Sequence, residues 1–219
     1  MNSGKQDRAA KQPWETERQI LEQIRRHRIT IERLLPREEL DRAPSTIKHL
    51  VQTRRISQWD HECGLRYWTR FARYPLSNKS LIGALGMLLF LEQSSGRTTI
   101  TPEDISTYFP HIFRKGLPRG YFVERHQRQT RLGLAKVDSC SRVSRIVSRT
   151  LRCIDKHRSD AGFRKLIDDD LFEIVWIMPT REKCRRTAAA LALCQASQVS
   201  VRTIEIPELL EVSAAIPSP

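Results

Sequence analysis

The sequence has no long hydrophobic run. Its longest apolar stretch, Leu81 to Leu91, contains two glycines and covers only about half of the roughly 20 residues that a membrane-spanning helix needs. Residues 1–13 are polar and lack the apolar core of a secretory signal peptide. We therefore expect a cytoplasmic protein without a membrane partner.

Cysteines at metal-binding or redox spacing are also missing. The five cysteines are an odd number, none belongs to a CxxC pair, and His61 and Cys63 have no second ligand pair at a matching distance. Reduced thiols and no metal site are the expectation. The sequence also lacks a phosphate-binding glycine loop and the GxSxG and HExxH motifs, so it predicts no resident cofactor.

Basic residues, by contrast, are abundant. The chain holds 38 Lys and Arg against 25 Asp and Glu, a formal net charge of +13. Hydrophobic residues make up 39% of the 219 residues, which is enough for a folded core. Residues 1–131 carry most of the excess, with 24 basic and 14 acidic residues. This balance favours a polyanionic partner, which could be DNA, RNA or an anionic membrane surface, and disfavours a generic metabolic enzyme; the missing hydrophobic run makes the membrane the weakest of the three.

Helical periodicity dominates the first part of the chain. We expect a flexible leader over 1–13, followed by a helical region over 14–118. Its predicted helices cover Trp14–Leu35, Ser45–Arg55, Cys63–Arg73, Ser80–Gln93, a Thr101-capped helix ending at Phe109, and His111–Lys115. In Cys63–Arg73 aromatic residues alternate with arginines, which favours inward-packed aromatics; stacking of those aromatics on nucleic-acid bases is the alternative.

The pattern changes after Pro118. Strands are predicted at Tyr121–Val123, Leu132–Val137, Leu171–Met178 and Val199–Ile206. Helices are predicted at Ser141–His157, Phe163–Ile167 and from Thr180 to about Ala196. Interleaved strands and helices indicate a mixed, largely parallel sheet covered by helices over 119–211, with a frayed tail over 212–219. The predicted fold class is α+β: a helical N-terminal region followed by a small mixed-sheet α/β module.

The most regular feature is a row of cations after Asp138, which we call the cationic ridge. It consists of Arg142, Arg145, Arg149, Arg152 and Lys156. At about 100° per residue, spacings of 3, 4, 3 and 4 place all five within roughly 80° of one helix face. Like charges four residues apart repel, and Asp155, the only nearby acid, lies off the ridge. The ridge therefore indicates a phosphate-binding surface; an ordinary solvated face is the alternative.

Residues 80–137 suggest a winged helix. Three helices between Ser80 and Lys115 would precede a hairpin at Tyr121–Val137, and winged helices use a basic hairpin beside a helix in the major groove. The basic residues on or near this hairpin are Arg114, Lys115, Arg119, Arg125, Arg128 and Arg131. The third helix is short for a recognition helix, so a plain helical bundle followed by a hairpin is the alternative.

The C-terminal element order is also that of the core of restriction-endonuclease-like nucleases, in which carboxylates on adjacent strands hold a divalent metal. The available candidates are Glu124 at the end of one strand and Asp138 at the end of the next, with Lys136 two residues earlier on the same face. This Lys-x-Asp order is the reverse of the usual acid-x-Lys. Magnesium is the expected cofactor only in this alternative.

Four segments together carry a resemblance to a known protein family. They are Leu117–Glu124, Arg131–Asp138, Gly162–Ile167 and Leu171–Val175, within about residues 80–211. In these features the chain resembles mobilisation and replication-relaxation type proteins of conjugative plasmids and integrative elements. The resemblance implies a winged helix before a nuclease-like, often inactive, domain and action at a DNA site. Members often carry an acidic residue where this chain has Lys136, which argues against catalysis.

The expected function is therefore a DNA-binding accessory protein of a mobile genetic element, acting in conjugative mobilisation, replication or its regulation. Two alternatives are a metal-dependent nuclease and a non-enzymatic adaptor whose basic face binds a relaxase or another acidic protein.

Overall fold

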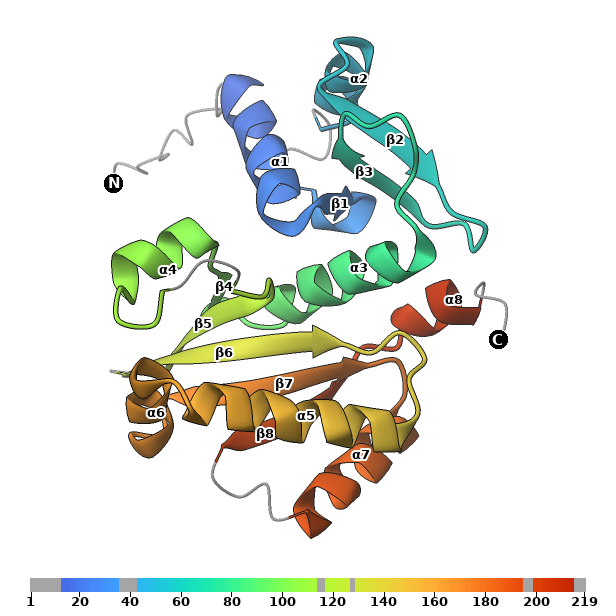
Figure 1. Cartoon of the computed structure of the whole chain (residues 1–219). Helices are drawn as coiled ribbons and strands as arrows, with labels where there is room; N and C mark the ends of the chain where they lie inside the picture. Colours follow the sequence, from blue (N-terminus) through green and yellow to red (C-terminus); the bar gives the residue numbers. More distant parts are fainter. Residues whose placement is uncertain (1–12, 36–42, 114–116, 127–128, 195–198, 215–219) are drawn as a thin grey trace, which may run out of the picture. The chain divides into compact units, whose positions relative to one another are not determined.

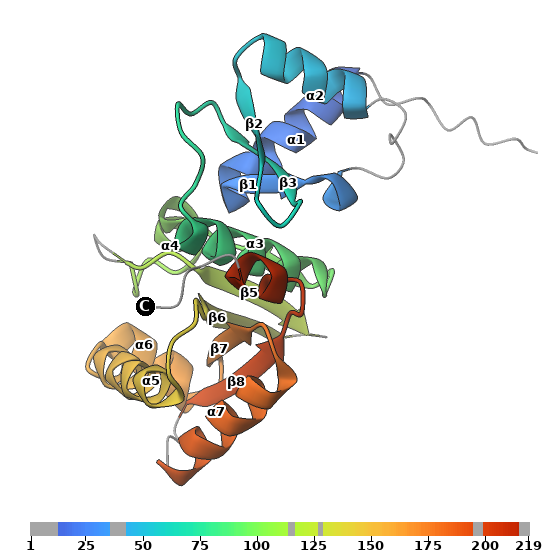
Figure 2. The same cartoon turned by 90° about the vertical axis from the view of Figure 1, so that its right-hand side faces the viewer.

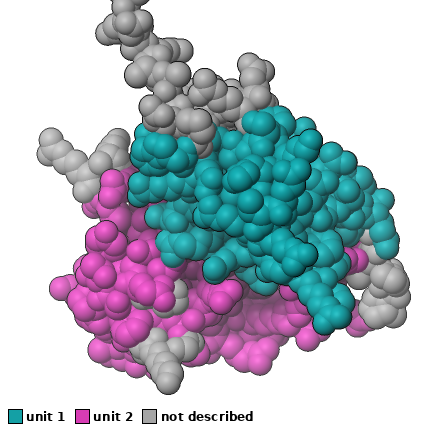
Figure 3. Space-filling model, turned by 90° about the horizontal axis from the view of Figure 1, so that it is seen from above, with its two compact units in different colours: residues 1–75 teal, residues 76–219 magenta. Residues whose placement is uncertain are grey.

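The computed structural model describes residues 13–35, 43–113, 117–126, 129–194 and 199–214. The chain divides into two compact units, residues 1–75 and residues 76–219 (Figures 1 and 3). The sequence analysis grouped 14–118 as one region, whereas the structure assigns residues 76–118 to the second unit. The helix at Ser80–Gln93 is therefore part of the α/β unit, because its apolar side chains cover that unit's sheet.

Unit 1 is a small α+β unit. Its elements are α1 (Pro13–His27), β1 (Ile29–Ile31), the 3-10 turn η1 (Glu32–Leu34), α2 (Ala43–Gln52), β2 (Ile56–Asp60) and β3 (Arg66–Arg70). The strands form an antiparallel sheet in the order β1-β3-β2. The two helices and the sheet share one apolar cluster that includes Ile20, Ile24, Leu50 and Trp68.

Two helix predictions in unit 1 are wrong in extent or type. The helix from Trp14 ends at His27, because Arg28 adopts a left-handed conformation (φ 73°) and β1 follows. The predicted helix Cys63–Arg73 is instead strand β3. As the central strand it is paired on both edges, and Tyr67, Trp68 and Thr69 are all buried, so it lacks the alternation by which a half-buried strand is recognised.

Unit 2 is built on a five-stranded mixed sheet. Its elements are α3 (Asn78–Glu92), β4 (Arg97–Thr99), α4 (Pro102–Tyr108), β5 (Tyr121–His126), β6 (Gln129–Val137), α5 (Val143–Arg158), α6 (Ala161–Asp168), β7 (Phe172–Met178), α7 (Arg181–Leu193), β8 (Ser200–Glu205) and α8 (Leu209–Ala214). The strand order is β4-β5-β6-β7-β8. The β4-β5-β6 pairs are antiparallel and the β6-β7-β8 pairs are parallel. The predicted mixed sheet and the α+β class are confirmed, but the sheet is not largely parallel, because β4 and β5 join it through antiparallel pairs.

Helices cover both faces of this sheet (Figure 2). α5, α6 and α7 pack on one face, where Leu132, Leu134 and Trp176 join residues of α5 and α6 in the main core. α3 lies on the other face and contacts α8. On that side Phe90 of α3 meets Phe122 of β5 edge to face, with ring centroids 4.9 Å apart. The side chains of each strand therefore divide between two differently covered faces.

The helix starts predicted at Thr101 and Thr180 are confirmed. Thr101 and Asp104 form a reciprocal capping box at the start of α4, and the Thr180 side chain accepts a hydrogen bond from Lys183 N at the start of α7. The predicted tail over 212–219 is wrong at its beginning, because α8 covers Leu209–Ala214 and Val212 is buried. Its apolar residues were too few to show helical periodicity.

The structure does not confirm the winged helix predicted for residues 80–137. The β5-β6 hairpin is not a projecting wing, because β6 is paired in parallel with β7 along its other edge. Residues 110–112 form a turn and 113 is irregular, where a helix over His111–Lys115 was predicted; Arg114 and Lys115 lie outside the described residues. The hairpin is thus part of the main sheet.

Candidate nucleic-acid interface

The inner face of α5 fixes the direction in which the cationic ridge points. Ile146, Val147 and Ile154 are buried against the sheet. The buried Thr150 hydroxyl accepts a 2.8 Å hydrogen bond from Nε1 of Trp176 on β7. Because apolar contacts and a directional bond hold the same face, rotation of α5 about its axis is restricted, and the ridge stays on the outer side.

The ridge retains its charge. Arg142, Arg145, Arg152 and Lys156 are exposed and Arg149 is half-buried. Within the described part of the chain, no carboxylate forms an ion pair with any of the five. Arg152 Nε donates a hydrogen bond to the carbonyl oxygen of Ser148 at 3.3 Å. Arg145, Arg149, Arg152 and Lys156 therefore lie along α5, with Arg142 at its N-cap, and described acids neutralise none of the five.

Helix α7 adds cations that the sequence analysis did not single out. α7 packs beside α5. Its Arg181, Arg185 and Arg186 are exposed. The adjacent Arg185-Arg186 pair was a visible signal in the sequence, but only the fold places this helix next to α5. The basic surface of unit 2 thus extends over two neighbouring helices.

The β5-β6 hairpin contributes less than expected. Arg125 is exposed, but Arg131 is paired with Asp170 at 2.6 Å. Arg128 lies outside the described residues, as do Arg114 and Lys115. Partial neutralisation at Arg131 leaves α5 as the stronger phosphate-binding candidate.

The three candidate nuclease residues are not brought together. Phe122 is paired with Gly133 and meets α3, so Glu124, two residues later, faces the α3 side. Asp138 forms an ion pair with Lys183 of α7 on the opposite face, at 2.5 Å. Lys136 shares that face, with its Nζ 5.9 Å from the centroid of the Trp176 ring. The sheet therefore separates Glu124 from Asp138 and Lys136.

Asp138 binds the starts of helices α5 and α7. Its side chain is fully buried, and Oδ1 accepts a 2.8 Å hydrogen bond from the backbone N–H of Ser141, just before α5. Oδ2 faces the Lys183 ammonium in the first turn of α7. Both oxygens thus have partners, and the residue connects β6 to α5 and α7.

Glu124 belongs to a polar network instead. Its carboxylate accepts from Arg97 Nε and Arg202 Nη2, each at 2.7 Å, and Arg202 Nη2 also reaches Glu173 at 2.8 Å. Burial opposes the charge on Arg202, but its bonds and proximity to Glu173 and Glu124 outweigh burial and raise its pKa. The buried Glu173, which the sequence analysis did not single out, is the second carboxylate of this network. No group of three His, Cys, Asp or Glu suited to a metal occurs among the described residues.

Unit 1 presents a second polar surface on α2. The helix contains no acidic residue, and Ala43, Ile47 and Leu50 are buried. Its outward face is formed by Ser45, Lys48, His49 and Gln52, all exposed. Their spacing of i, i+3, i+4 and i+7 places them on one side of the helix. All four side chains can donate hydrogen bonds.

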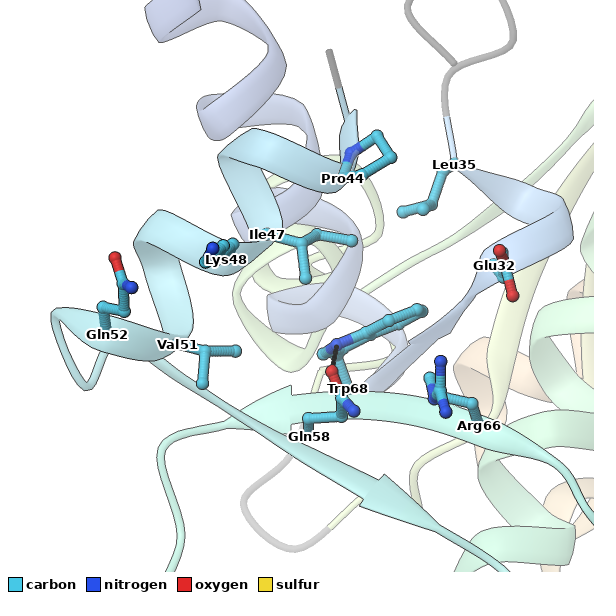
Figure 4. Close-up of a pocket in the computed structure, with 10 residues that line it drawn as sticks. All are labelled: Glu32, Leu35, Pro44, Ile47, Lys48, Val51, Gln52, Gln58, Arg66 and Trp68. Carbon is cyan, nitrogen blue, oxygen red and sulfur yellow. Dashed lines mark hydrogen bonds between the residues drawn. The ribbon is translucent and has the colours of Figure 1, made fainter. Parts of the chain in front are cut away.

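A shallow pocket of about 290 Å³ lies between α2 and the sheet of unit 1 (Figure 4). Its lining residues are Glu32, Leu35, Pro44, Ile47, Lys48, Val51, Gln52, Gln58, Arg66 and Trp68. Nε1 of Trp68 donates to Gln58 Oε1 at 3.2 Å across the floor. The volume is at the lower limit for small-molecule sites, and positive and negative side chains are mixed, so the pocket does not indicate a particular ligand.

Comparisons give no neighbour from which a role could be transferred. No protein-family model, curated protein or solved structure matches the chain. Over the described ranges, every helix is too short or too polar to cross a membrane.

Proposed function

We propose that the protein binds DNA and that the cationic ridge on α5 is a principal phosphate-binding surface. The observation that carries this proposal is the ridge itself: four cations on one face of α5 and Arg142 at its N-cap, without ion-pair partners among the described carboxylates. Lys and Arg that contact phosphates supply most of the sequence-independent affinity of DNA-binding proteins. Arg185 and Arg186 on α7 extend the available surface.

Unit 1 supports the proposal through its topology. Helix, strand, helical turn, helix and two strands follow in that order, and the first strand lies beside the third. Winged-helix domains share this arrangement, in which the helix before the hairpin enters the major groove. We propose that unit 1 is such a domain and that α2 is its groove-binding helix. The winged helix then lies at 13–70, not at 80–137.

The exposed face of α2 suits this role chemically. Lys48 and Gln52 can bind acceptors on base edges, and Ser45 and His49 can bind bases or phosphates. The absence of acidic residues on α2 avoids repulsion from the DNA backbone. In this proposal unit 1 reads sequence, while the ridge of unit 2 adds affinity.

The biological setting is proposed from the resemblance alone. A DNA-binding accessory role in a mobile genetic element, in mobilisation, replication or regulation, fits a basic protein of two units. The nuclease alternative has little support, because Glu124 and Asp138 face opposite sides of the sheet. The adaptor alternative needs only the basic surface, so the test must use DNA directly.

Charge reversal on the ridge tests the function. We expect Arg145→Glu combined with Arg149→Glu to weaken binding to duplex DNA by more than tenfold, because phosphate attraction becomes repulsion. Fluorescence anisotropy at several salt concentrations measures the dissociation constant. For five phosphate contacts, affinity of the unchanged protein should fall by about 500-fold between 50 and 200 mM salt.

A matched control distinguishes the effect of charge on the ridge from the effect of the protein's net charge. Lys79→Glu combined with Lys165→Glu changes the net charge equally at two exposed sites of unit 2, on α3 and α6, that do not belong to the ridge. This control should bind within about threefold of the unchanged protein. Equal losses in both double variants would remove the ridge from the proposal, and no binding of DNA by the unchanged protein at physiological salt would overturn it.

A further inference from the structure

Two exposed aromatic side chains follow β3. Phe71 is 58% exposed and Tyr74 is 70% exposed. Tyr67 and Trp68, a few residues earlier, are buried in unit 1. The aromatic-arginine segment thus separates into a buried part that stabilises the fold and an outer part, residues 70–74, whose side chains are accessible.

Hydrogen bonds fix the backbone at the start of this outer part, at Phe71 and Ala72. The N–H of Phe71 donates to the carbonyl oxygen of Arg55 at 3.1 Å. Ala72 is bound twice by Ser57, whose hydroxyl accepts from Ala72 N at 3.0 Å and donates to Ala72 O at 3.1 Å. Phe71 is therefore presented from an anchored stretch of backbone, and Tyr74 follows two residues beyond the anchored Ala72, so less backbone freedom would be lost at Phe71 when a ligand binds.

The surroundings of the aromatic rings are cationic. Arg70 and Arg73 are exposed and alternate with the two aromatic residues, and the Arg73 guanidinium lies 5.7 Å from the centroid of the Tyr74 ring. Neither arginine forms an ion pair with a carboxylate of the described residues, nor does the exposed Arg54, the neighbour of Arg55, whose carbonyl oxygen binds Phe71. The sequence contains no Asp or Glu between Glu62 and Glu92.

This combination discriminates between partners. Aromatic residues and arginine are also enriched in protein–protein interfaces, so the rings and arginines alone do not identify the partner. The charge balance does: Arg70 and Arg73 have no ion pair with a described carboxylate, and no Asp or Glu occurs between Glu62 and Glu92, which favours a polyanion. Surfaces for single-stranded nucleic acid combine aromatic rings, on which bases stack, with cations that follow the backbone. Phe71 and Tyr74 are three residues apart, at most about 11 Å along the chain, which is within the reach of neighbouring bases of one strand.

We propose that residues 70–74 bind unpaired bases of single-stranded nucleic acid. Phe71 and Tyr74 stack on bases, and Arg70 and Arg73 contact the adjacent phosphates. The inference shares only its class of ligand with the proposed function, since neither the ridge nor the outward face of α2 is needed for stacking. It adds a preference for unpaired strands to the proposed duplex binding.

The test compares one strand with a duplex, using the full chain. The probe is a fluorescein-labelled oligothymidylate of roughly 16 nucleotides, long enough for a single-strand site. Phe71→Ala combined with Tyr74→Ala should weaken its binding at least tenfold and change duplex binding less than threefold. Phe71→Trp combined with Tyr74→Trp keeps the stacking surface and should bind the strand within about threefold of the unchanged protein.

A matched control removes two exposed aromatic residues elsewhere. Tyr108→Ala combined with Phe113→Ala, at side chains 70% and 45% exposed in unit 2, should leave strand binding unchanged. Unaltered strand binding by the Phe71/Tyr74 alanine variant, or an equal loss in the control, overturns the inference. If the unchanged protein binds duplex DNA but not the single strand, the inference is overturned while the proposed function stands, and a protein partner for the exposed rings is favoured. If it binds neither the duplex nor the single strand, the inference and the proposed function are both overturned.

Discussion

Trp176 on β7 and Thr150 on α5 are joined by a buried 2.8 Å hydrogen bond from the indole Nε1 to the hydroxyl oxygen. The Thr150 hydroxyl in turn donates to the carbonyl oxygen of Ile146 at 2.8 Å. The bond therefore ties the middle of the ridge helix to the centre of the sheet. Its position explains how a helix with one highly charged face is kept in a single orientation.

Replacement of Thr150 by valine should destabilise the protein by about 1–3 kcal/mol, because the buried indole N–H loses its acceptor. Thr150→Ser keeps the hydroxyl and should be milder. Urea denaturation measures the free energy of unfolding. A Val variant as stable as the Ser variant would show that the bond contributes nothing to the position of α5.

Removal of Arg202 should destabilise unit 2, because the carboxylates of Glu124 and Glu173 lose their hydrogen bonds and ion pairs with its guanidinium group. Breaking a fully buried ion pair costs about 3–5 kcal/mol. The Arg202 side chain is 36% exposed, so solvent screening reduces the expected cost of Arg202→Met to about 2 kcal/mol. Arg145→Met, at an exposed arginine without a described ion pair, should change stability by less than about 0.5 kcal/mol. Equal thermal midpoints for the two variants would contradict the prediction.

Acid should destabilise unit 1 through His27. Burial, with a smaller contribution from the charge of Arg26, lowers the pKa of His27 from 6.5 to about 4. The unfolded chain therefore takes up a proton near pH 6.5, whereas the folded unit resists protonation until about pH 4. The free energy of unfolding should therefore fall as the pH decreases from about 6.5 to 4. Below about pH 4, His27 is protonated in both states and causes no further loss.

His27→Gln, which does not titrate, should flatten the pH dependence in that window. Glu22 acts at lower pH: hydrogen bonds from Arg25 and then Arg26 lower its pKa from 4.5 to about 2, and the stability that it contributes is lost as the pH falls through that range. Thermal melts from pH 7 to pH 3 separate the two groups. An unchanged slope between pH 6.5 and 4.5 in the Gln variant would refute the assignment to His27.

Arg54 stands where helix ends favour glycine. Its φ is +56°, and α2 closes through bonds from Arg54 N to Val51 O and from Arg55 N to Leu50 O. Arg54→Gly should therefore stabilise unit 1 by up to about 1 kcal/mol, because glycine adopts this conformation without a Cβ penalty. The same change removes an exposed cation and should weaken strand binding. A variant that is less stable than the unchanged protein would contradict this account.

The local sequence was sufficient for several features. The spacing of Arg142 to Lys156 defined the cationic ridge, and Thr101 and Thr180 marked helix starts that the structure confirms. The apolar run Leu171–Met178 identified a strand that is buried along its whole length. These signals depend on neighbours within a few residues, so periodicity and capping chemistry reveal them.

Contacts between distant segments decided the rest. Only the sheet shows that Glu124 and Asp138 face opposite sides, that Arg131 meets Asp170, and that the ring of Phe122 lies over Gly133, where an added Cβ would be 2.1 Å away. Only pairing on both edges makes the aromatic segment at Tyr67 and Trp68 a strand. Sequence determined charge, caps and periodicity because these act locally; strand order determined faces and partners because those depend on residues far apart in the chain.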